Sequence, residues 1–149
     1  MRAFITYVRP IVVYNSSIWS PSSVGDIESV ERVQRRFTKR LPGLKNMSYD
    51  QHLKFLNVPS LELRRLRADL YWCYKILFNL VAVTSDVFFT KNFCTSTRGH
   101  QYKLCLCAFK LFAERVINDW NNLPESIDFS TLSRFKLTTK RVRFSNLRF

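Results

Sequence analysis

The stretch from Ser60 to Val81 constrains the fold most, because its apolar residues lie on two sides of one helix. At 100° per residue, one apolar stripe runs the length of the stretch and a shorter one lies nearly opposite. The first stripe comprises Leu63, Leu66, Leu70, Tyr74, Leu77 and Val81, and the second comprises Ala68, Trp72 and Ile76. Such a helix is buried among other helices. We expect residues 60–81 to form the central helix of a bundle, with Ser60 as its cap.

Residues that interrupt helices are scarce along the whole chain. Only three glycines and five prolines occur among 149 residues, and 46% of the residues are hydrophobic. This length suits one domain with a substantial core. We predict an all-α fold, a single irregular bundle of about five or six helices over residues 1–149. One long loop (about 84–103) and a basic C-terminal tail complete the prediction.

Caps and turns predict where the other helices lie. Pro10 breaks or kinks a helix in the apolar stretch 2–19. A second helix starts at Ser22 or Ser23 and stops at Pro42-Gly43, and a third opens with a capping box of Ser48 and Gln51 and runs to about Leu56. A further helix runs from Phe109 to Trp120 and is stopped by residues 121–124. A last short helix is capped by Ser130, with Leu132 and Phe135 facing inward.

The stretch VERVQRRFTKRLPGL (30–44) carries five cations in nine positions. Val30, Val33, Gln34, Phe37 and Leu41 share one helical face, and Arg32, Arg35, Arg36 and Lys39 lie roughly opposite. The formal net charge of the chain is +13. A phosphate backbone would relieve the repulsion among these positive charges. A basic face of this kind is either an ordinary solvated surface or a surface for nucleic acid.

Two further basic clusters support the second interpretation, one in residues 64–67 and one in the tail after Phe129. If the three clusters converge, they form a groove that follows phosphates. The candidate RNA- or DNA-binding residues are Arg32, Arg35, Arg36, Lys39, Arg40, Arg64, Arg65, Arg67, Arg141 and Arg143, with Arg134, Lys136, Lys140 and Arg148 also in the tail. A membrane-surface role is less favoured, because the cations are spread over three elements.

The sequence offers no targeting or spanning segment. No run of 18 uncharged apolar residues occurs, and the apolar start is split by Arg9 and Pro10 without a clear cleavage site. We expect an intracellular protein, nuclear or cytoplasmic, that does not contact membrane. The cysteines Cys73, Cys94, Cys105 and Cys107 match no disulfide or zinc spacing and are interpreted as reduced, buried thiols.

Groups that could carry out chemistry are few. The six aspartates and five glutamates are scattered, so the chain lacks the paired carboxylates of a two-metal nucleotidyl-transfer site. His52 is expected to be exposed or partly packed, and His100 to be a turn residue, although an enzyme using His100 or Cys107 is an alternative. We predict no catalytic residue, metal, cofactor or small-molecule substrate. Most aromatic residues have core spacing, and only Phe144 and Phe149 are plausible base-stacking residues.

Several stretches together resemble a known family. They are TYVRPIVVYNSSIWSP (6–21), DIESVERVQRRFTKRLPGLKNMSYDQHLKFLNVPSLELRRLRADL (26–70), YKIL (74–77), TRGH (97–100) and WNNLPESI (120–127). In this order, over about residues 4–136, they are similar to the C-terminal region of reverse transcriptases of non-LTR retrotransposons, the LINE and jockey-type elements.

The resemblance implies a helical region beyond the palm and thumb of an RNA-directed DNA polymerase, often fused to an endonuclease. The paired catalytic aspartates of that family lie upstream, and no position here matches them. The expected partners are RNA or DNA and the remainder of the polymerase chain. Met1 falls inside the family pattern, so we expect a truncated copy or a gene-model fragment. The alternative is a helical protein- or nucleic-acid-binding module adopted by its host, with no polymerase role.

Overall fold

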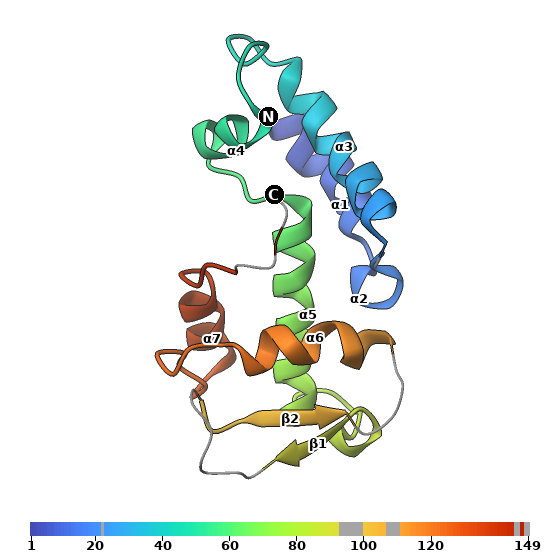
Figure 1. Cartoon of the computed structure of the whole chain (residues 1–149), viewed down its shortest axis with the longest axis vertical. Helices are drawn as coiled ribbons and strands as arrows, with labels where there is room; N and C mark the ends of the chain where they lie inside the picture. Colours follow the sequence, from blue (N-terminus) through green and yellow to red (C-terminus); the bar gives the residue numbers. More distant parts are fainter. Residues whose placement is uncertain (22, 93–99, 107–110, 145–146, 148–149) are drawn as a thin grey trace. The chain divides into compact units, whose positions relative to one another are not determined.

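The computed structural model describes residues 1–21, 23–92, 100–106, 111–144 and 147 (Figure 1). The predicted helical character is confirmed, because these residues are mostly helical. All-α is wrong in detail, since the described residues also contain one two-stranded sheet. The elements are η1 (Phe4–Val8), α1 (Arg9–Val13), α2 (Ser16–Trp19), α3 (Val24–Lys39), α4 (Tyr49–Leu56), α5 (Leu61–Leu77), η2 (Ser85–Val87), β1 (Phe89–Asn92), β2 (Lys103–Leu106), α6 (Leu111–Asn121) and α7 (Leu132–Thr139).

The chain divides into two compact units. Unit 1 contains Met1–Leu66 and Leu147–Phe149, and unit 2 contains Arg67–Asn146. Helix α5 contributes residues to both, because the division falls between Leu66 and Arg67. The prediction of a single irregular bundle stays a prediction.

The N-terminal stretch forms three short helical pieces where one interrupted helix was expected. Segment η1 is a π-helix, and the N–H of Arg9 donates to the carbonyl of Phe4. Pro10 then lies in the first turn of α1, where a missing N–H is tolerated. Asn15 adopts a left-handed conformation with φ 54°, which separates α1 from α2. The break or kink expected at Pro10 is therefore a π-helix followed by the start of a new helix.

Helices α3 and α4 of unit 1 begin at the predicted caps. The Ser23 hydroxyl accepts from the N–H of Asp26 at 3.2 Å, and Ser48 and Gln51 form both bonds of a capping box. After α3, Gly43 has φ 80°, a conformation that glycine adopts without a Cβ penalty. The Phe4 ring stacks on Phe37 at 4.8 Å, so η1 contacts α3. Phe4 and Leu44 are both buried.

Helix α5 confirms its predicted cap and most of its first stripe. The Ser60 hydroxyl accepts from the N–H of Leu63 at 3.1 Å. Buried side chains of the first stripe are Leu66, Leu70, Tyr74 and Leu77, whereas Leu63 and Val81 are half-buried. The helix ends at Leu77, four residues earlier than expected, and Asn79 follows in a left-handed conformation with φ 53°. The second stripe is wrong at Trp72, which is 41% exposed.

The predicted loop over about 84–103 is wrong in part. Segment η2 and strand β1 occupy its first half, and β2 begins at its end. The strands pair antiparallel, with Phe89 opposite Leu106 and Asn92 opposite Lys103. Phe89 and Leu104 are buried while Thr90 and Cys105 are exposed, the alternation of a strand with one covered face. Residues 93–99, which include Cys94 and the TRG of TRGH, lie outside the described residues.

Helices α6 and α7 bring the aromatic core of unit 2 together. Helix α6 packs beside β2, and Trp120 and Phe135 are fully buried with ring centroids 5.6 Å apart. Phe135 also stacks on Tyr74 at 4.7 Å. Helix α6 ends at Asn121, as predicted. Its start near Phe109 lies outside the described residues.

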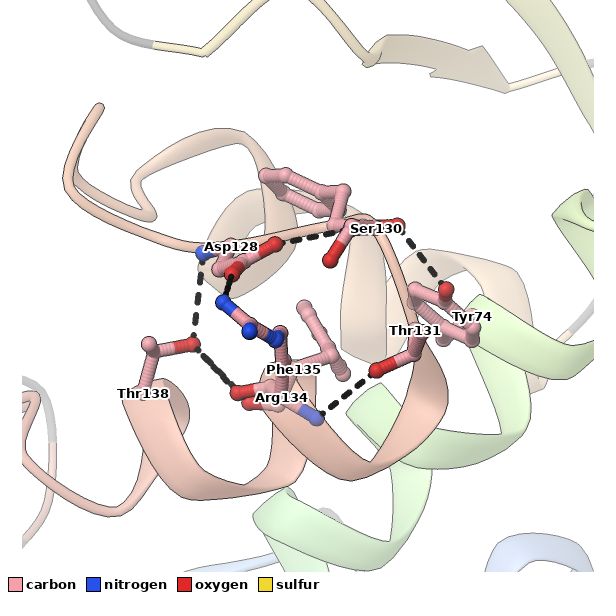
Figure 2. Close-up of polar contacts among 8 residues, drawn as sticks. Tyr74, Asp128, Ser130, Thr131, Arg134, Phe135 and Thr138 are labelled. Atoms are coloured by element: carbon pink, nitrogen blue, oxygen red, sulfur yellow. Dashed lines mark hydrogen bonds and ion pairs between the residues drawn. The ribbon is translucent and has the colours of Figure 1, made fainter.

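The start of α7 differs from the prediction by one residue. Thr131, rather than Ser130, caps the helix, since its hydroxyl accepts from the N–H of Arg134 at 3.2 Å (Figure 2). The carboxylate of Asp128 accepts from the N–H of Ser130 at 2.9 Å and from the Arg134 guanidinium at 3.2 Å. The Tyr74 hydroxyl donates to the carbonyl of Phe129 at 2.9 Å, which ties α5 to the segment before α7.

Candidate nucleic-acid interface

The buried face of α3 is centred on Gln34 and is more polar than its sequence suggested. Glu31, Gln34 and Thr38 are buried, whereas Val33, expected on the inner face, is 40% exposed. Val30, Phe37 and Leu41 are half-buried. The helix is thus rotated relative to the predicted orientation, with polar side chains taking the deepest positions.

A hydrogen-bonded network sets this rotation. Gln34 donates from its amide nitrogen to the Tyr49 hydroxyl and to the Pro59 carbonyl, both at 3.1 Å. The Glu31 carboxylate accepts from the backbone N–H groups of Leu61 and Glu62, each at 3.1 Å, and from the Tyr49 hydroxyl. Glu31 therefore lies at the N-terminus of α5, where the helix dipole favours a negative charge. Burial, followed by the hydrogen bond to Glu31, raises the pKa of Tyr49.

His52, on α4, belongs to a second buried network that also includes Thr38 of α3. Its Nδ1 lies 3.2 Å from the Thr38 hydroxyl and its Nε2 lies 2.6 Å from the carbonyl oxygen of Leu44. Only 2% of His52 is exposed, so the expectation of an exposed or partly packed residue is wrong. The reason is that both ring nitrogens find partners in the interior, which makes complete burial tolerable. His52 joins α4 to α3 and to the loop between them.

These networks leave the opposite side of α3 facing outward. Arg32, Arg36, Lys39 and Arg40 are all exposed, and we call them the α3 basic face. Within the part of the chain that the structure describes, no ion pair involves any of these four. Arg35 differs, because it is half-buried and its guanidinium carbon lies 5.0 Å from the centre of the Tyr49 ring. Arg35 therefore packs against α4 while its neighbours face solvent.

The three arginines of the second predicted cluster, in residues 64–67, differ in how deeply they are buried. Arg64 is exposed, Arg65 is only 3% exposed, and Arg67 is half-buried. The Arg67 guanidinium donates to the carbonyl of Lys140 at 3.0 Å, and burial lowers its pKa. A phosphate can reach Arg64 directly, whereas Arg65 would first have to move outward. The role of Arg65 and Arg67 in binding stays a prediction.

In the tail, Arg141 and Arg143 are exposed beyond the end of α7. They belong to unit 2, whereas the α3 basic face belongs to unit 1. The convergence of the three clusters into one groove stays a prediction. Phe144, one of the two expected base-stacking residues, is half-buried, and Phe149 lies outside the described residues.

His100 has a structural role in unit 2. Its Nδ1 accepts from the N–H of Tyr102 at 3.2 Å, so Nε2, 2.8 Å from the Trp120 carbonyl, carries the ring proton and donates it. Only 5% of the residue is exposed, a burial that the expectation of a turn residue did not include. Burial is the main cause that lowers the pKa of His100, while the bond to Trp120 raises it and Lys103 lowers it further. Both nitrogens are thus occupied, which leaves neither for proton transfer to a substrate.

Other candidate groups carry little chemistry where they are described. Cys73 is buried as expected, and burial together with the charge of Asp69 raises the pKa of its thiol. Cys105 is exposed, contrary to expectation, because it lies on the outer side of β2. Cys107 lies outside the described residues. Among the described residues, no three metal-ligating side chains come together. Over the same residues, every helix is too short or too polar to cross a bilayer.

The burial of Arg9 was missed by the sequence reasoning. Arg9 is only 8% exposed, and its guanidinium lies 5.9 Å from the centre of the Phe4 ring. The available signal was a single arginine inside an apolar stretch, which was interpreted as a break.

Comparison with known proteins adds no relative: no family model, no curated protein and no solved structure matches the chain.

Proposed function

We propose that this chain is a C-terminal piece of a non-LTR retrotransposon reverse transcriptase that contacts the RNA or DNA backbone through the α3 basic face. It acts inside the cell, in the nucleus or cytoplasm, as one helical domain of a larger polymerase chain. The catalytic aspartates belong to another part of that chain, so the piece is not an enzyme by itself. The observation that carries the proposal is an exposed row of four cations with no ion pair among the described residues.

The dimensions of the row suit a phosphate backbone. From Arg32 to Lys39 the helix rises about 10 Å, at about 1.5 Å per residue. A strand of duplex nucleic acid presents a phosphate about every 3.4 Å of its axis, so the row spans about three phosphates. The polar network under α3 fixes the direction in which the row faces.

Salt dependence of binding tests the proposal. The logarithm of the affinity for an RNA–DNA hybrid is plotted against the logarithm of salt concentration, for the wild type and for Arg32→Gln, Arg36→Gln, Lys39→Gln and Arg40→Gln combined. We expect the slope to flatten by up to about 0.9 for each phosphate that the variant no longer neutralises. Lys45→Gln and Lys54→Gln, both exposed in unit 1, are matched controls that keep the wild-type slope. A wild-type slope near zero would make the α3 basic face an ordinary solvated surface.

The lineage has a separate test. The reading frame upstream of Met1 and the 5′ end of the transcript are mapped. An open frame that leads back to paired aspartates supports the polymerase origin. Stop codons directly upstream of a start site near Met1 oppose it.

A second candidate, a host-adopted protein-binding module, is favoured by one observation. Tyr7, Ile11 and Ile18 in the first three helical segments, and Tyr14 between α1 and α2, are each between 72% and 76% exposed. Several large apolar side chains exposed within one short segment favour a contact surface. A transcript that starts near Met1 under its own regulation supports this candidate over the polymerase piece.

A further inference from the structure

We infer that Trp72 and Lys75, on the exposed side of α5 in unit 2, hold one unpaired nucleotide of a single-stranded RNA or DNA segment. The indole ring stacks on the base, and the ammonium group of Lys75 contacts the phosphate. The inference rests on the proposed function for its class of ligand, a nucleic acid. It concerns a site separate from the α3 basic face, and it narrows the ligand to one whose bases are accessible.

Trp72 is a large aromatic side chain that remains partly in solvent. It was expected inside the bundle together with Ile76, yet 41% of Trp72 is exposed while Ile76 is buried. An indole ring left in water forgoes the free energy that its burial would give. The exposed ring of Trp72 is therefore accessible to another flat ring that would cover it.

A cation lies beside this ring. The Nζ of Lys75 is 4.7 Å from the centre of the Trp72 ring. Lys75 follows Trp72 by three residues, which places both side chains on one side of the helix. Neither of the ion pairs formed by the described residues includes Lys75. The pair thus offers a flat apolar surface together with a positive charge that no carboxylate of these ion pairs offsets.

A second pair of the same kind lies next to the first. Lys136 of α7 places its Nζ 5.5 Å from the centre of the ring of Tyr71, the residue before Trp72. The Tyr71 ring is half-buried and meets the Phe135 ring edge-on at 6.2 Å, which fixes its position. Around the helix, Lys75 lies between the two rings, about 40° from Tyr71 and about 60° from Trp72. The two cation–ring pairs therefore share one side of α5.

Rings interleaved with cations suit a single strand better than a duplex. In a duplex the faces of the bases are covered by their neighbours, and proteins reach only the phosphates, the sugars and the base edges. In a single strand the bases can turn outward and stack on aromatic side chains while cations follow the backbone. An acidic peptide would pair with the two lysines, but its carboxylates gain nothing from the negative face of an aromatic ring. A nucleotide uses both the ring and the charge.

The test compares two strands that carry the same number of phosphates. One is a short unstructured oligothymidine, and the other has abasic residues in place of its bases. The affinity of the full chain for each strand is measured by the fluorescence anisotropy of a dye attached to the strand. We expect the wild type to bind the oligothymidine at least about tenfold more tightly, because stacking adds to the phosphate contacts. Trp72→Ala should lose this preference, whereas Trp72→Phe, which keeps a flat ring, should retain part of it.

Two control variants separate the ring from the charge and from exposure alone. Trp19→Ala removes a tryptophan of similar exposure, 43%, from unit 1, so it should keep the wild-type preference for bases. Lys75→Gln keeps the ring and removes the charge. It should also retain the preference, while it binds both strands more weakly and flattens the salt dependence by up to about 0.7 for the lost phosphate contact.

Three outcomes overturn the inference. The first is a wild type that binds the two strands equally or binds neither. The second is an unchanged preference in a Trp72→Ala chain that circular dichroism shows to be folded. If Trp72→Ala does not fold, Trp72→Leu, which keeps apolar bulk without a flat ring, replaces it and should also lose the preference. The third is displacement of the oligothymidine by an oligoglutamate of equal charge in a manner that depends on Trp72, which would assign the surface to an acidic peptide.

The quadruple substitution of the α3 basic face separates this site from the proposed function. That variant should weaken the binding of both strands by the same factor and leave the preference for bases unchanged. If wild-type binding of the RNA–DNA hybrid does not depend on salt while the preference that requires Trp72 remains, the proposed function fails and the site stands. If binding of the hybrid depends on salt and the preference for bases is absent, the inference alone fails.

Discussion

In unit 1 the buried face of α3 carries Glu31, Gln34 and Thr38, whereas in unit 2 the helices bury Tyr74, Trp120 and Phe135. The first interior is held by directional bonds, such as those from Gln34 to Tyr49 and Pro59. The second is held by stacked rings, with Tyr74 and Phe135 at 4.7 Å. Hydrogen bonds fix the rotation of a helix, while ring packing removes a large apolar area from water. The interior of unit 1 therefore fixes the direction in which the α3 basic face points, whereas the interior of unit 2 mainly stabilises the fold by burying apolar area.

The largest effect is expected from the ring packing. Trp120→Ala removes a fully buried ring and the hydrogen bond from its Nε1 to the Tyr102 carbonyl at 2.7 Å. We expect the free energy of unfolding to fall by about 3–5 kcal/mol, measured by urea denaturation followed by circular dichroism. Trp72→Ala is the matched control, because Trp72 is 41% exposed, and it should cost under about 1 kcal/mol. Similar losses in the two variants would show that the aromatic interior does not stabilise unit 2 as its geometry implies.

A smaller loss is expected when the polar interior of unit 1 is broken. Glu31→Ala leaves the N–H groups of Leu61 and Glu62 without their acceptor and removes the partner of the Tyr49 hydroxyl. We expect a loss of about 2–4 kcal/mol in the free energy of unfolding. Glu28→Ala, an exposed residue on the same helix, should change stability by less than about 0.5 kcal/mol.

Glu31→Ala also tests the link between the network and the α3 basic face. If Glu31 fixes the rotation of α3, the variant should bind the RNA–DNA hybrid more weakly even under conditions where it remains folded. A folded Glu31→Ala with wild-type affinity would separate the two and leave the network with a role in stability alone.

The contrast between the interiors also explains which features the sequence could predict. The positions Leu70, Tyr74, Val116, Trp120 and Phe135 repeat with helical spacing, so their burial in unit 2 was predictable from a periodic pattern. No local pattern marks a buried glutamate as the cap of a helix thirty residues later. The rotation of α3 was therefore missed.

The candidate site also contains residues whose exposure the sequence predicted and one residue whose packing it did not. The exposure of Arg32, Arg36 and Lys39 followed from their place opposite the apolar stripe. The packing of Arg35 depends on Tyr49, which is distant in sequence, and could not be predicted from the local pattern. Strands β1 and β2 are four residues each, too short for an alternating pattern to stand out, and their hydrogen bonds join segments separated by residues 93–102.

The smallest expected effect is the pH dependence that His100 gives to the stability of unit 2. His100 is buried among rings in unit 2, and its pKa in the folded chain lies below the ordinary value of 6.5. As the pH falls through about 6.5, the unfolded chain takes up a proton that the folded chain does not, so folding stability decreases. Above that pH both states are neutral at His100, and its bonds to Trp120 and Tyr102 contribute fully. His100→Gln should therefore lose less stability than the wild type between about pH 7.5 and pH 5.5, although it is less stable at the higher pH. Urea denaturation at the two pH values measures the difference, and the NMR titration of the His100 ring identifies the group. An equal loss in both proteins would assign the acid sensitivity to other groups and leave His100 with a packing role alone.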